Sequence, residues 1–210
     1  MKTYIAVKEH SLRCPKKNHV LLPYVLTQVK SYLDVLVIVD SEELANICKD
    51  YNVSYYMETD TEKLSEFNAI YNYLTNNGRL NTEEEFIILP ATQPFRNKET
   101  ILNVIDACLG DYDVVTTYTE VSNRSIFMLK EDNTFKVDSY NRKGCMCPSE
   151  KMADGSIYKM TNKFLKKVVE SEDSNHEFWG SKIKFVKNAS PIFLDVDNPT
   201  DLEIFKMIVK

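Results

Sequence analysis

The stretch Val35-Leu36-Val37-Ile38-Val39-Asp40-Ser41 indicates the fold class of this chain. Its first five residues are apolar and mostly β-branched, so they predict a strand over Val35–Val39. Asp40 and Ser41 then begin a predicted helix that runs to about Tyr51, because the Ser41 hydroxyl can accept a hydrogen bond from an orphan amide of the first turn. A strand that passes directly into a helix is the building unit of layered α/β folds.

The same alternation of apolar runs and helical patterns recurs through most of the chain. Further strands are predicted at Thr3–Val7, Val53–Tyr56, Phe86–Leu89, Asp113–Thr119, Ser156–Met160, Lys182–Val186 and Ile192–Val196, with a hairpin at Ser125–Leu129 and Thr134–Val137. Further helices are predicted at about Val20–Leu33, Leu64–Leu74 with a Gly78 C-cap, Lys98–Leu109 closed by Gly110, Asn162–Ser171 and Pro199–Val209. Ser139–Ala153 shows no period and is expected to be a long loop. Together these elements predict an α/β fold with a largely parallel sheet.

Composition narrows the classes of function. The chain has 210 residues, of which 43% are hydrophobic, and we expect one domain over residues 1–210. Its net charge of −5 argues against nucleic-acid binding. No apolar run approaches the ~20 residues that span a bilayer, and the first residues are too short for a signal-peptide core, so we expect a cytoplasmic protein without membrane contact. The five cysteines lack framework spacing and are expected to be free thiols. His10, Cys14 and His19 do not have the spacing of a standard metal site.

Four separated segments carry residues suited to ligand chemistry. They are Ser11-Leu12-Arg13-Cys14-Pro15-Lys16-Lys17-Asn18, Pro90-Ala91-Thr92-Gln93-Pro94-Phe95-Arg96, Asp154-Gly155-Ser156-Ile157-Tyr158 and Asp195-Val196-Asp197-Asn198-Pro199. Each adjoins the end or the start of a predicted strand, which is where open α/β sheets place ligand-binding groups. We therefore expect them to form one site, of the kind found in nucleotide-using enzymes.

The first segment concentrates positive charge in an acidic chain. Lys8, Arg13, Lys16 and Lys17 lie within one loop that Pro15 stiffens. Backbone amides together with Arg and Lys heads bind phosphate oxygens and offset charge on a leaving group, so the loop suits a polyphosphate. The alternative is a solvated basic loop.

The last segment offers a pair of carboxylates. Asp195 and Asp197 are two residues apart, so their side chains share a face if the chain stays extended. Two carboxylates are a usual protein contribution to Mg²⁺, which completes its shell with water and substrate phosphates. The alternative is that Asp197 merely shapes the start of the last helix, for which Asn198 is the predicted N-cap and Pro199 the first helical residue.

The two middle segments offer polar and aromatic groups. Thr92 and Gln93 follow a central strand and are expected to face the ligand crevice. Arg96 can bind an anion or brace its own loop. Tyr158 can contact a ligand or serve as a core aromatic residue with a solvated hydroxyl.

These segments, in this order and at this spacing, resemble the acylneuraminate cytidylyltransferase family, or CMP-sialic acid synthetases, with CMP-KDO synthetases next closest. The resemblance covers nearly the whole chain. The family's Ser-x-x-Leu-Pro-x-Lys-Asn is matched by Ser11–Asn18, with Cys14 in place of Leu, and its Asp-x-Asp-x-Pro-x-Asp-Leu by Asp195–Leu202. Pro90–Arg96 matches Gln-Pro-Thr-Ser-Pro-Leu-Arg in part, and Asp154–Tyr158 matches Asn-Gly-Ala-Ile-Tyr.

The resemblance implies a three-layer Rossmann-like nucleotidyltransferase fold and an enzyme that uses CTP, Mg²⁺ and an acidic sugar, either sialic acid or a related nonulosonate. The anomeric hydroxyl of the sugar would attack the α-phosphorus, and pyrophosphate would leave. A homodimer is also implied, with Ser139–Ala153 and the neighbouring hairpin as the candidate contact region. The resemblance implies that the catalytic residues are Lys17, Arg13, Asp195 and Asp197, and that the two aspartates hold Mg²⁺. The residues implied to bind the nucleotide are Lys8, Ser11, Asn18, Thr92 and Gln93. Those implied to bind the sugar are Arg96, Arg142 and Tyr158.

The chain departs from the family in its first loop. The common Ala-Arg-Gly-Gly is Val7-Lys8-Glu9-His10 here, so the glycines that let a backbone approach phosphates are absent and Glu9 adds a negative charge. Two alternatives therefore stay open: a nucleotidyltransferase of the same fold with another nucleotide or acceptor, and a diverged, non-catalytic nucleotide-binding protein.

Overall fold

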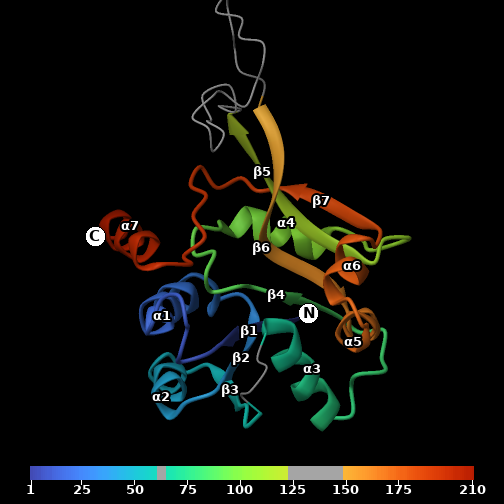
Figure 1. Ribbon diagram of the computed structural model, residues 1–210, viewed down its shortest axis with the longest axis horizontal. Coiled ribbons are helices and arrows are strands. Elements are labelled where there is room, and N and C mark those ends of the chain that lie inside the picture. Colours follow the sequence, from blue (N-terminus) through green and yellow to red (C-terminus); the bar gives the residue numbers. More distant parts are fainter. Residues whose placement is uncertain (61–64, 123–148) are drawn as a thin grey trace, which may run out of the picture.

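The computed structural model describes residues 1–60, 65–122 and 149–210, and within these ranges seven strands form one sheet in the order β3-β2-β1-β4-β6-β5-β7 (Figure 1). The strands are β1 Lys2–Val7, β2 Asp34–Val39, β3 Ser54–Met57, β4 Glu85–Ile88, β5 Val114–Ser122, β6 Ser149–Thr161 and β7 Ile183–Lys187. β6 runs antiparallel to β4 and β5, and the other pairings are parallel. The predicted largely parallel sheet is therefore confirmed.

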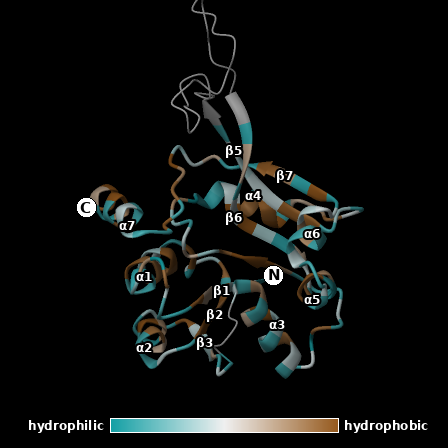
Figure 2. Cartoon of the chain, in the orientation of Figure 1, coloured by the Kyte–Doolittle hydropathy of each residue, from teal (hydrophilic) through white to brown (hydrophobic). Residues whose placement is uncertain are grey.

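Helices cover both faces of the sheet, which gives three layers. They are α1 Lys17–Val29, α2 Glu42–Asp50, α3 Glu66–Asn76, α4 Lys98–Asp106, α5 Asn162–Glu170, α6 Ser174–Trp179 and α7 Pro199–Ile208. Buried residues of α1, α2, α4 and α7 belong to one core cluster, and those of α3, α5 and α6 belong to a second. In Figure 2 the helices are hydrophobic on part of their surface and hydrophilic on the rest, as expected for helices packed on a sheet. None of the helices in the described ranges combines the length and the apolar character needed to span a bilayer.

Strand β1 shows how the sheet separates the two cores. Tyr4 and Ala6 pack into the cluster with α3, whereas Ile5 and Val7 pack into the cluster with α1. Successive side chains of a strand point to opposite faces, so a continuous apolar run is required where both faces are covered. The run Val35–Val39 meets the same requirement in β2, where all five residues are buried.

Helix ends follow the predicted capping residues. Ser41 Oγ accepts a hydrogen bond from Leu44 N (3.3 Å) at the start of α2. Asn198 and Asp201 form a reciprocal capping box at the start of α7, with Pro199 at its first position. Gly78 has φ +65° directly after α3 and donates to Thr75 O (3.0 Å), a left-handed cap that glycine adopts without strain.

Two helices differ from their predicted bounds. α1 begins at Lys17, three residues before the predicted start. α4 ends at Asp106, before Gly110, because Lys159 Nζ binds the carbonyl oxygens of Ile105 and Ala107 (2.8 Å each) and so ends the ladder of the helix. A buried ammonium from the sheet thus replaces the glycine cap that the sequence indicates.

The predictions for several other segments were wrong. Ile192–Val196 is not a strand, because Val196 N donates to Thr92 O (2.8 Å) instead of joining the sheet. Residues 149–153 belong to β6 and pair with β5, although we predicted a loop there. α6, capped by Asp173, was not predicted. The predicted hairpin strands and residues 139–148 lie outside the described residues.

Candidate active site

A cavity of about 500 Å³ lies beyond the carboxyl ends of β1 and β4. We call it the first cavity. Its walls come from the loop after β1, the starts of α1 and α3, the loop after β4 and the segment before α7. They include Val7, Lys8, Ser11, Leu12, Arg13, Lys17, Asn18, Ser65, Glu66, Ala91, Thr92 and Asp197. The structure thus brings the first, second and last of the four sequence segments together at one place, as expected for strand ends of an open α/β sheet.

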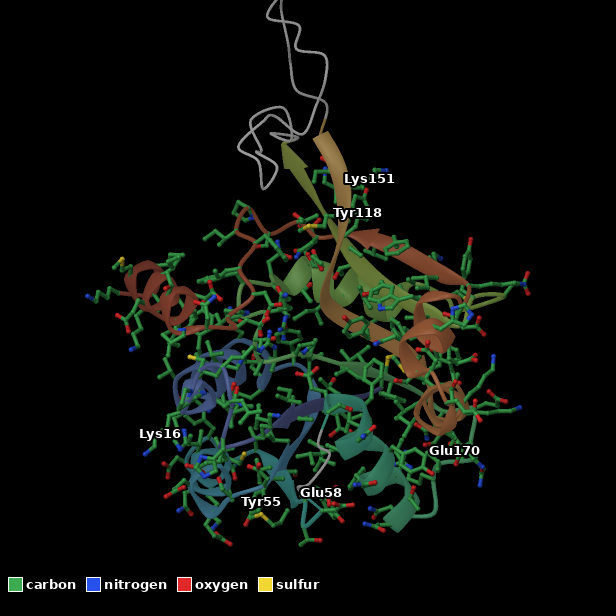
Figure 3. All side chains as sticks on the ribbon, viewed as in Figure 1. Lys16, Tyr55, Glu58, Tyr118, Lys151 and Glu170 are labelled. Atoms are coloured by element: carbon green, nitrogen blue, oxygen red, sulfur yellow. The ribbon has the colours of Figure 1, made fainter. Side chains whose placement is uncertain are left out.

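The start of α1 lies at this cavity and has no side-chain cap. Its N-cap residue, Lys16, has φ +59°, and the first turn contains no acidic residue. The amides of Lys17 and His19 donate to the carbonyl oxygens of Cys14 (3.4 Å) and Lys16 (3.1 Å), so the helix dipole is the main feature of this end that favours an anion. The side chain of Lys16 is exposed at the outer edge of the molecule (Figure 3) and does not line the cavity.

The loop before α1 is held by its own side chains. Ser11 Oγ accepts from Cys14 N (3.3 Å), and Asn18 Nδ2 donates to Lys8 O (2.7 Å). Ser11 and Asn18 are buried, and Asn18 Oδ1 is a buried acceptor without a hydrogen-bond partner. Both residues therefore fix the loop, while Asn18 keeps one acceptor for a ligand.

Lys17 and Arg13 converge on the acidic end of the site. The ammonium of Lys17, only 6% exposed as a residue, donates to Val196 O (2.6 Å) and lies 3.5 Å from Asp197 Oδ1. Arg13 Nη1 lies 2.9 Å from Asp197 Oδ2 and its side chain is largely exposed. A buried, charged lysine needs such partners, since an unpaired ammonium is costly to bury. The cationic and anionic parts of the site are thus in direct contact.

Asp195 and Asp197 are close enough to influence each other, although the chain between them is not extended. Asp197 N donates to Asp195 O (3.1 Å), which closes a tight turn at Val196. Desolvation and the charge of Asp197 raise the pKa of Asp195, against a hydrogen bond with Thr92 that lowers it. Two carboxylates that repel each other, of which Asp197 lines the first cavity, suit a hard divalent cation such as Mg²⁺.

Of the predicted residues in the loop after β4, one lines the first cavity and two are buried within the loop. Thr92 lines the first cavity. Gln93 is buried, and its N–H donates to Pro90 O (3.2 Å). Arg96 is buried and donates from Nη2 to the carbonyl oxygens of Pro90 and Gln93, and burial lowers its pKa to about 10. Arg96 therefore braces the loop, and it is not among the residues that line the first cavity.

A second cavity, of about 430 Å³, adjoins the first and shares Ser65 and Glu66 with it. Its walls come from α3, β6, α5 and α6. They are Ser65, Glu66, Phe67, Asn68, Tyr158, Val168, Val169, Ser174, Asn175, Phe178 and Trp179. The rings of Tyr158, Phe67 and Phe178 form a cluster: the Tyr158 centroid lies 5.9 Å from that of Phe67 and 5.6 Å from that of Phe178, and the two phenylalanine centroids lie 5.4 Å apart. The described walls thus contain an aromatic cluster and few ionisable groups.

Glu66 is the functional candidate that sequence reasoning missed. It begins α3, just after the N-cap Ser65, and lines both cavities. Burial raises its pKa to about 7, with a further rise from Asp195 and opposing effects of Arg96 and Lys17. A carboxyl group that titrates near neutrality inside a cavity is a candidate for proton transfer. The signal available in the sequence was its position shortly after a parallel strand.

The segment Asp154–Tyr158 is a bulge of β6 built on a buried polar network. Asp154 accepts from Thr117 Oγ1, Ser156 N (3.0 Å) and Asn188 Nδ2 (3.0 Å). Gly155 has φ +62°, and a Cβ there would clash with the Tyr158 hydroxyl. The match to the family's Asn-Gly-Ala-Ile-Tyr thus corresponds to a bulge that positions Tyr158 at the second cavity.

Glu9 lies elsewhere than expected. It does not line the first cavity but turns toward His19 and Glu43, and its backbone N–H donates to Asp40 Oδ1 (2.7 Å). Hydrogen bonding with Ser41, and then with Glu43, lowers the pKa of Glu9 despite burial. The expectation that Glu9 adds negative charge beside the phosphates was therefore wrong. Arg142, the remaining predicted residue, lies outside the described residues.

No protein-family model matches the chain, and no curated protein sequence is significantly similar to it. Solved structures are similar along its whole length. CMP:2-keto-3-deoxy-manno-octonic acid synthetase complexed with CTP aligns over 99% of this chain and 97% of its own, with a TM-score of 0.64 and 16% identity. A 4-diphosphocytidyl-2C-methyl-D-erythritol synthase aligns over 100% and 97%, with a TM-score of 0.67 and 13% identity. HddC from Yersinia pseudotuberculosis aligns over 100% and 99%, with a TM-score of 0.58 and 15% identity. At these identities the similarity shows the fold, which is the Rossmann-like nucleotidyltransferase fold that the sequence predicts.

Proposed function

We propose that this protein transfers CMP from CTP to a hydroxyl group of an acceptor and releases pyrophosphate. The first cavity is the observation that carries this proposal. A buried lysine, an exposed arginine and a helix start without a side-chain cap meet there, and each of these features favours phosphate oxygens. CTP is the proposed nucleotide because the four segments resemble CTP-using enzymes and because one similar structure was solved with CTP.

Asp195 and Asp197 are the proposed ligands of Mg²⁺. The carboxylate donor set and the raised pKa of Asp195 fit a cation of this kind. Bound there, Mg²⁺ would neutralise charge on the phosphates. Lys17 and Arg13 would exchange part of their contact with Asp197 for phosphate oxygens, which frees carboxylate oxygens for the cation. Lys8, Ser11, Asn18, Thr92 and Gln93 remain the proposed nucleotide-binding residues.

The second cavity is the proposed acceptor site, because it adjoins the first where Glu66 lies. The acceptor oxygen would bond to the α-phosphorus as the bond from that phosphorus to the pyrophosphate oxygen breaks. We assign the proton of the acceptor hydroxyl to the carboxylate of Glu66, whose pKa of about 7 suits a base near neutral pH. Arg13 and Lys17 would offset the charge on the leaving pyrophosphate.

The acceptor class that the sequence resemblance favours is an acidic sugar, sialic acid or a related nonulosonate, contacted by Tyr158, Arg96 and Arg142. One observation favours a second class. Among the described lining residues of the second cavity there is no lysine or arginine, and Glu66 is its acidic group. Aromatic side chains with few charged neighbours suit the apolar face of an uncharged sugar or a small polyol.

A pyrophosphate-release assay tests both acceptor classes. CTP and Mg²⁺ are incubated with N-acetylneuraminate, KDO, legionaminate, pseudaminate and the uncharged polyol 2C-methyl-D-erythritol, with UTP and ATP as nucleotide controls. Release that requires CTP and one acceptor supports the proposal and identifies the acceptor. CTP binding without release across the panel, unchanged in Asp195→Asn and Asp197→Asn, would favour a non-catalytic nucleotide-binding protein instead.

A homodimer and a cytoplasmic location complete the proposal. β5 and β6 extend beyond the rest of the sheet (Figure 1), and Lys151 Nζ lies 5.0 Å from the Tyr118 ring on this extension (Figure 3). Residues 149–153 of this extension belong to the candidate contact region of the homodimer that the family resemblance implies. Analytical ultracentrifugation at micromolar concentration tests the dimer, and a monomer there would contradict it.

A further inference from the structure

Three potential metal ligands meet away from both cavities. Glu9 follows β1, His19 lies in the first turns of α1, and Glu43 lies in the first turn of α2. One ligand atom from each of the three lies within 4.8 Å of the others. Two carboxylates and an imidazole from three different elements are therefore gathered around one point.

The innermost of these groups, Glu9, has one carboxylate oxygen without a hydrogen-bond partner, although its carboxylate interacts with Ser41, Glu43 and His19. Glu9 is only 5% exposed, and its Oε2 is buried without a hydrogen-bond partner. His19 Nε2 lies 3.5 Å from Glu9 Oε1, and His19 Nδ1 is also buried without a partner. A buried carboxylate oxygen without a donor is costly, so it indicates a cation or a water in this place.

The spacing of the ligand atoms is compatible with a cation. Carboxylate and imidazole ligands lie about 2.0–2.2 Å from a zinc ion, so two neighbouring ligands are separated by roughly 3 to 3.5 Å. The separation of 3.5 Å between His19 Nε2 and Glu9 Oε1 fits two ligands of one ion. Glu43 is exposed, so an ion can enter and water can complete its shell from that side.

We propose that Glu9, His19 and Glu43 bind a divalent transition-metal ion, Mn²⁺ or Zn²⁺. The imidazole ligand favours these ions over Mg²⁺, which prefers oxygen ligands alone. The ion would join the loop after β1 to α1 and α2, and so hold in place the loop that carries Arg13 and Lys8. The site is separate from Asp195 and Asp197, and it does not depend on the function proposed above.

The test counts Mn²⁺ bound in the absence of nucleotide, from the electron paramagnetic resonance signal of the free ion. An Asp195→Asn, Asp197→Asn double variant removes the proposed Mg²⁺ site, and we expect it to bind one Mn²⁺. Adding His19→Gln, which keeps a hydrogen-bonding side chain, should weaken that binding at least about 100-fold. The matched control is His176→Gln on exposed α6, which should leave binding unchanged.

A second variant separates ligand loss from misfolding. Glu43 is exposed, so Glu43→Gln should keep the fold by circular dichroism and weaken Mn²⁺ binding at least about tenfold. Zn²⁺ should raise the midpoint of thermal unfolding of the double variant and not that of the form with His19→Gln. Absence of a Mn²⁺ site in the double variant, or equal binding after His19→Gln or Glu43→Gln, would overturn the proposal in favour of a plain histidine–carboxylate ion pair.

Discussion

Replacing Glu66 with Gln should raise the free energy of unfolding near neutral pH, because the charged carboxylate of Glu66 destabilises the folded protein there. In the folded state the pKa of Glu66 is raised to about 7 by burial, from an ordinary value of 4.5. The folded state therefore holds this proton more tightly than the unfolded chain, and the unfolding free energy falls as pH rises from about 4.5 to 7. This loss of unfolding free energy is absent below pH 4.5 and reaches its full size above pH 7.

The size of the effect follows from the two pKa values. A change from 4.5 to about 7 corresponds to roughly 3 kcal/mol of unfolding free energy, as an upper limit. Glu66 lines two cavities that water enters, so solvent screens part of this cost. We expect Glu66→Gln to gain about 1–2 kcal/mol relative to wild type between pH 5 and pH 8.

Urea unfolding at pH 5, 6, 7 and 8 measures this gain. Effects of other titrating groups cancel when the variant is subtracted from wild type at each pH. The matched control is Glu99→Gln, which removes an exposed carboxylate from the first turn of α4 and so reproduces the loss of charge at a helix start. A difference between wild type and Glu66→Gln that stays constant from pH 5 to 8, like that of the control, would refute the reasoning.

Three further substitutions test other parts of the site. Lys17→Met should raise the Kd for CTP in Mg²⁺ at least about tenfold by calorimetry, because it removes a buried charge-assisted donor; an unchanged Kd would remove Lys17 from the phosphate site. Gly155→Ala should lower the free energy of unfolding in urea by about 2–3 kcal/mol, because it adds a clash with Tyr158 to the strain of a positive φ. Gly110→Ala, where a Cβ meets open space, should lower it by only about 1 kcal/mol, from the backbone strain alone. Equal losses in the two variants would exclude the clash. Asn198→Ala should cost about 1 kcal/mol and lower the Tm by a few degrees, whereas an unchanged Tm would mean that the capping box does not stabilise α7.

Local chemistry explains what the sequence predicted correctly. The apolar runs of β1 and β2 and the caps Ser41 and Asn198 depend on neighbouring residues alone, so their patterns are readable without tertiary structure. The meeting of the basic loop with Asp197 was predicted correctly but for the wrong reason, because Ile192–Val196 is not a strand and this segment reaches the site through the bond of Val196 N to Thr92 O.

What was missed depends on distant contacts. The proposed role of Glu66 depends on two cavities whose walls come from several other elements and loops, and no local pattern encodes them. α6 has six residues, too few to show a helical period. Ile192–Val196 is mostly apolar like a strand, but Val196 N bonds to Thr92 O instead of joining the sheet. The direction of Glu9 likewise depends on α1 and α2 packing beside it.

The contacts of Lys17 and Arg13 with the segment before α7 also determine at which point of its synthesis the chain can complete the proposed nucleotide site. These contacts join residues separated by 179 and 184 positions in the chain. A ribosome adds roughly 5–20 residues per second, so on the order of ten seconds or more pass between the synthesis of the basic loop and that of its acidic partner. During that interval Arg13 and Lys17 lack their acidic partner, and the first cavity lacks the wall that contains Asp197. Competence to bind a nucleotide is thus expected to arise only once the segment from Asp195 to Asp201 has emerged and docked.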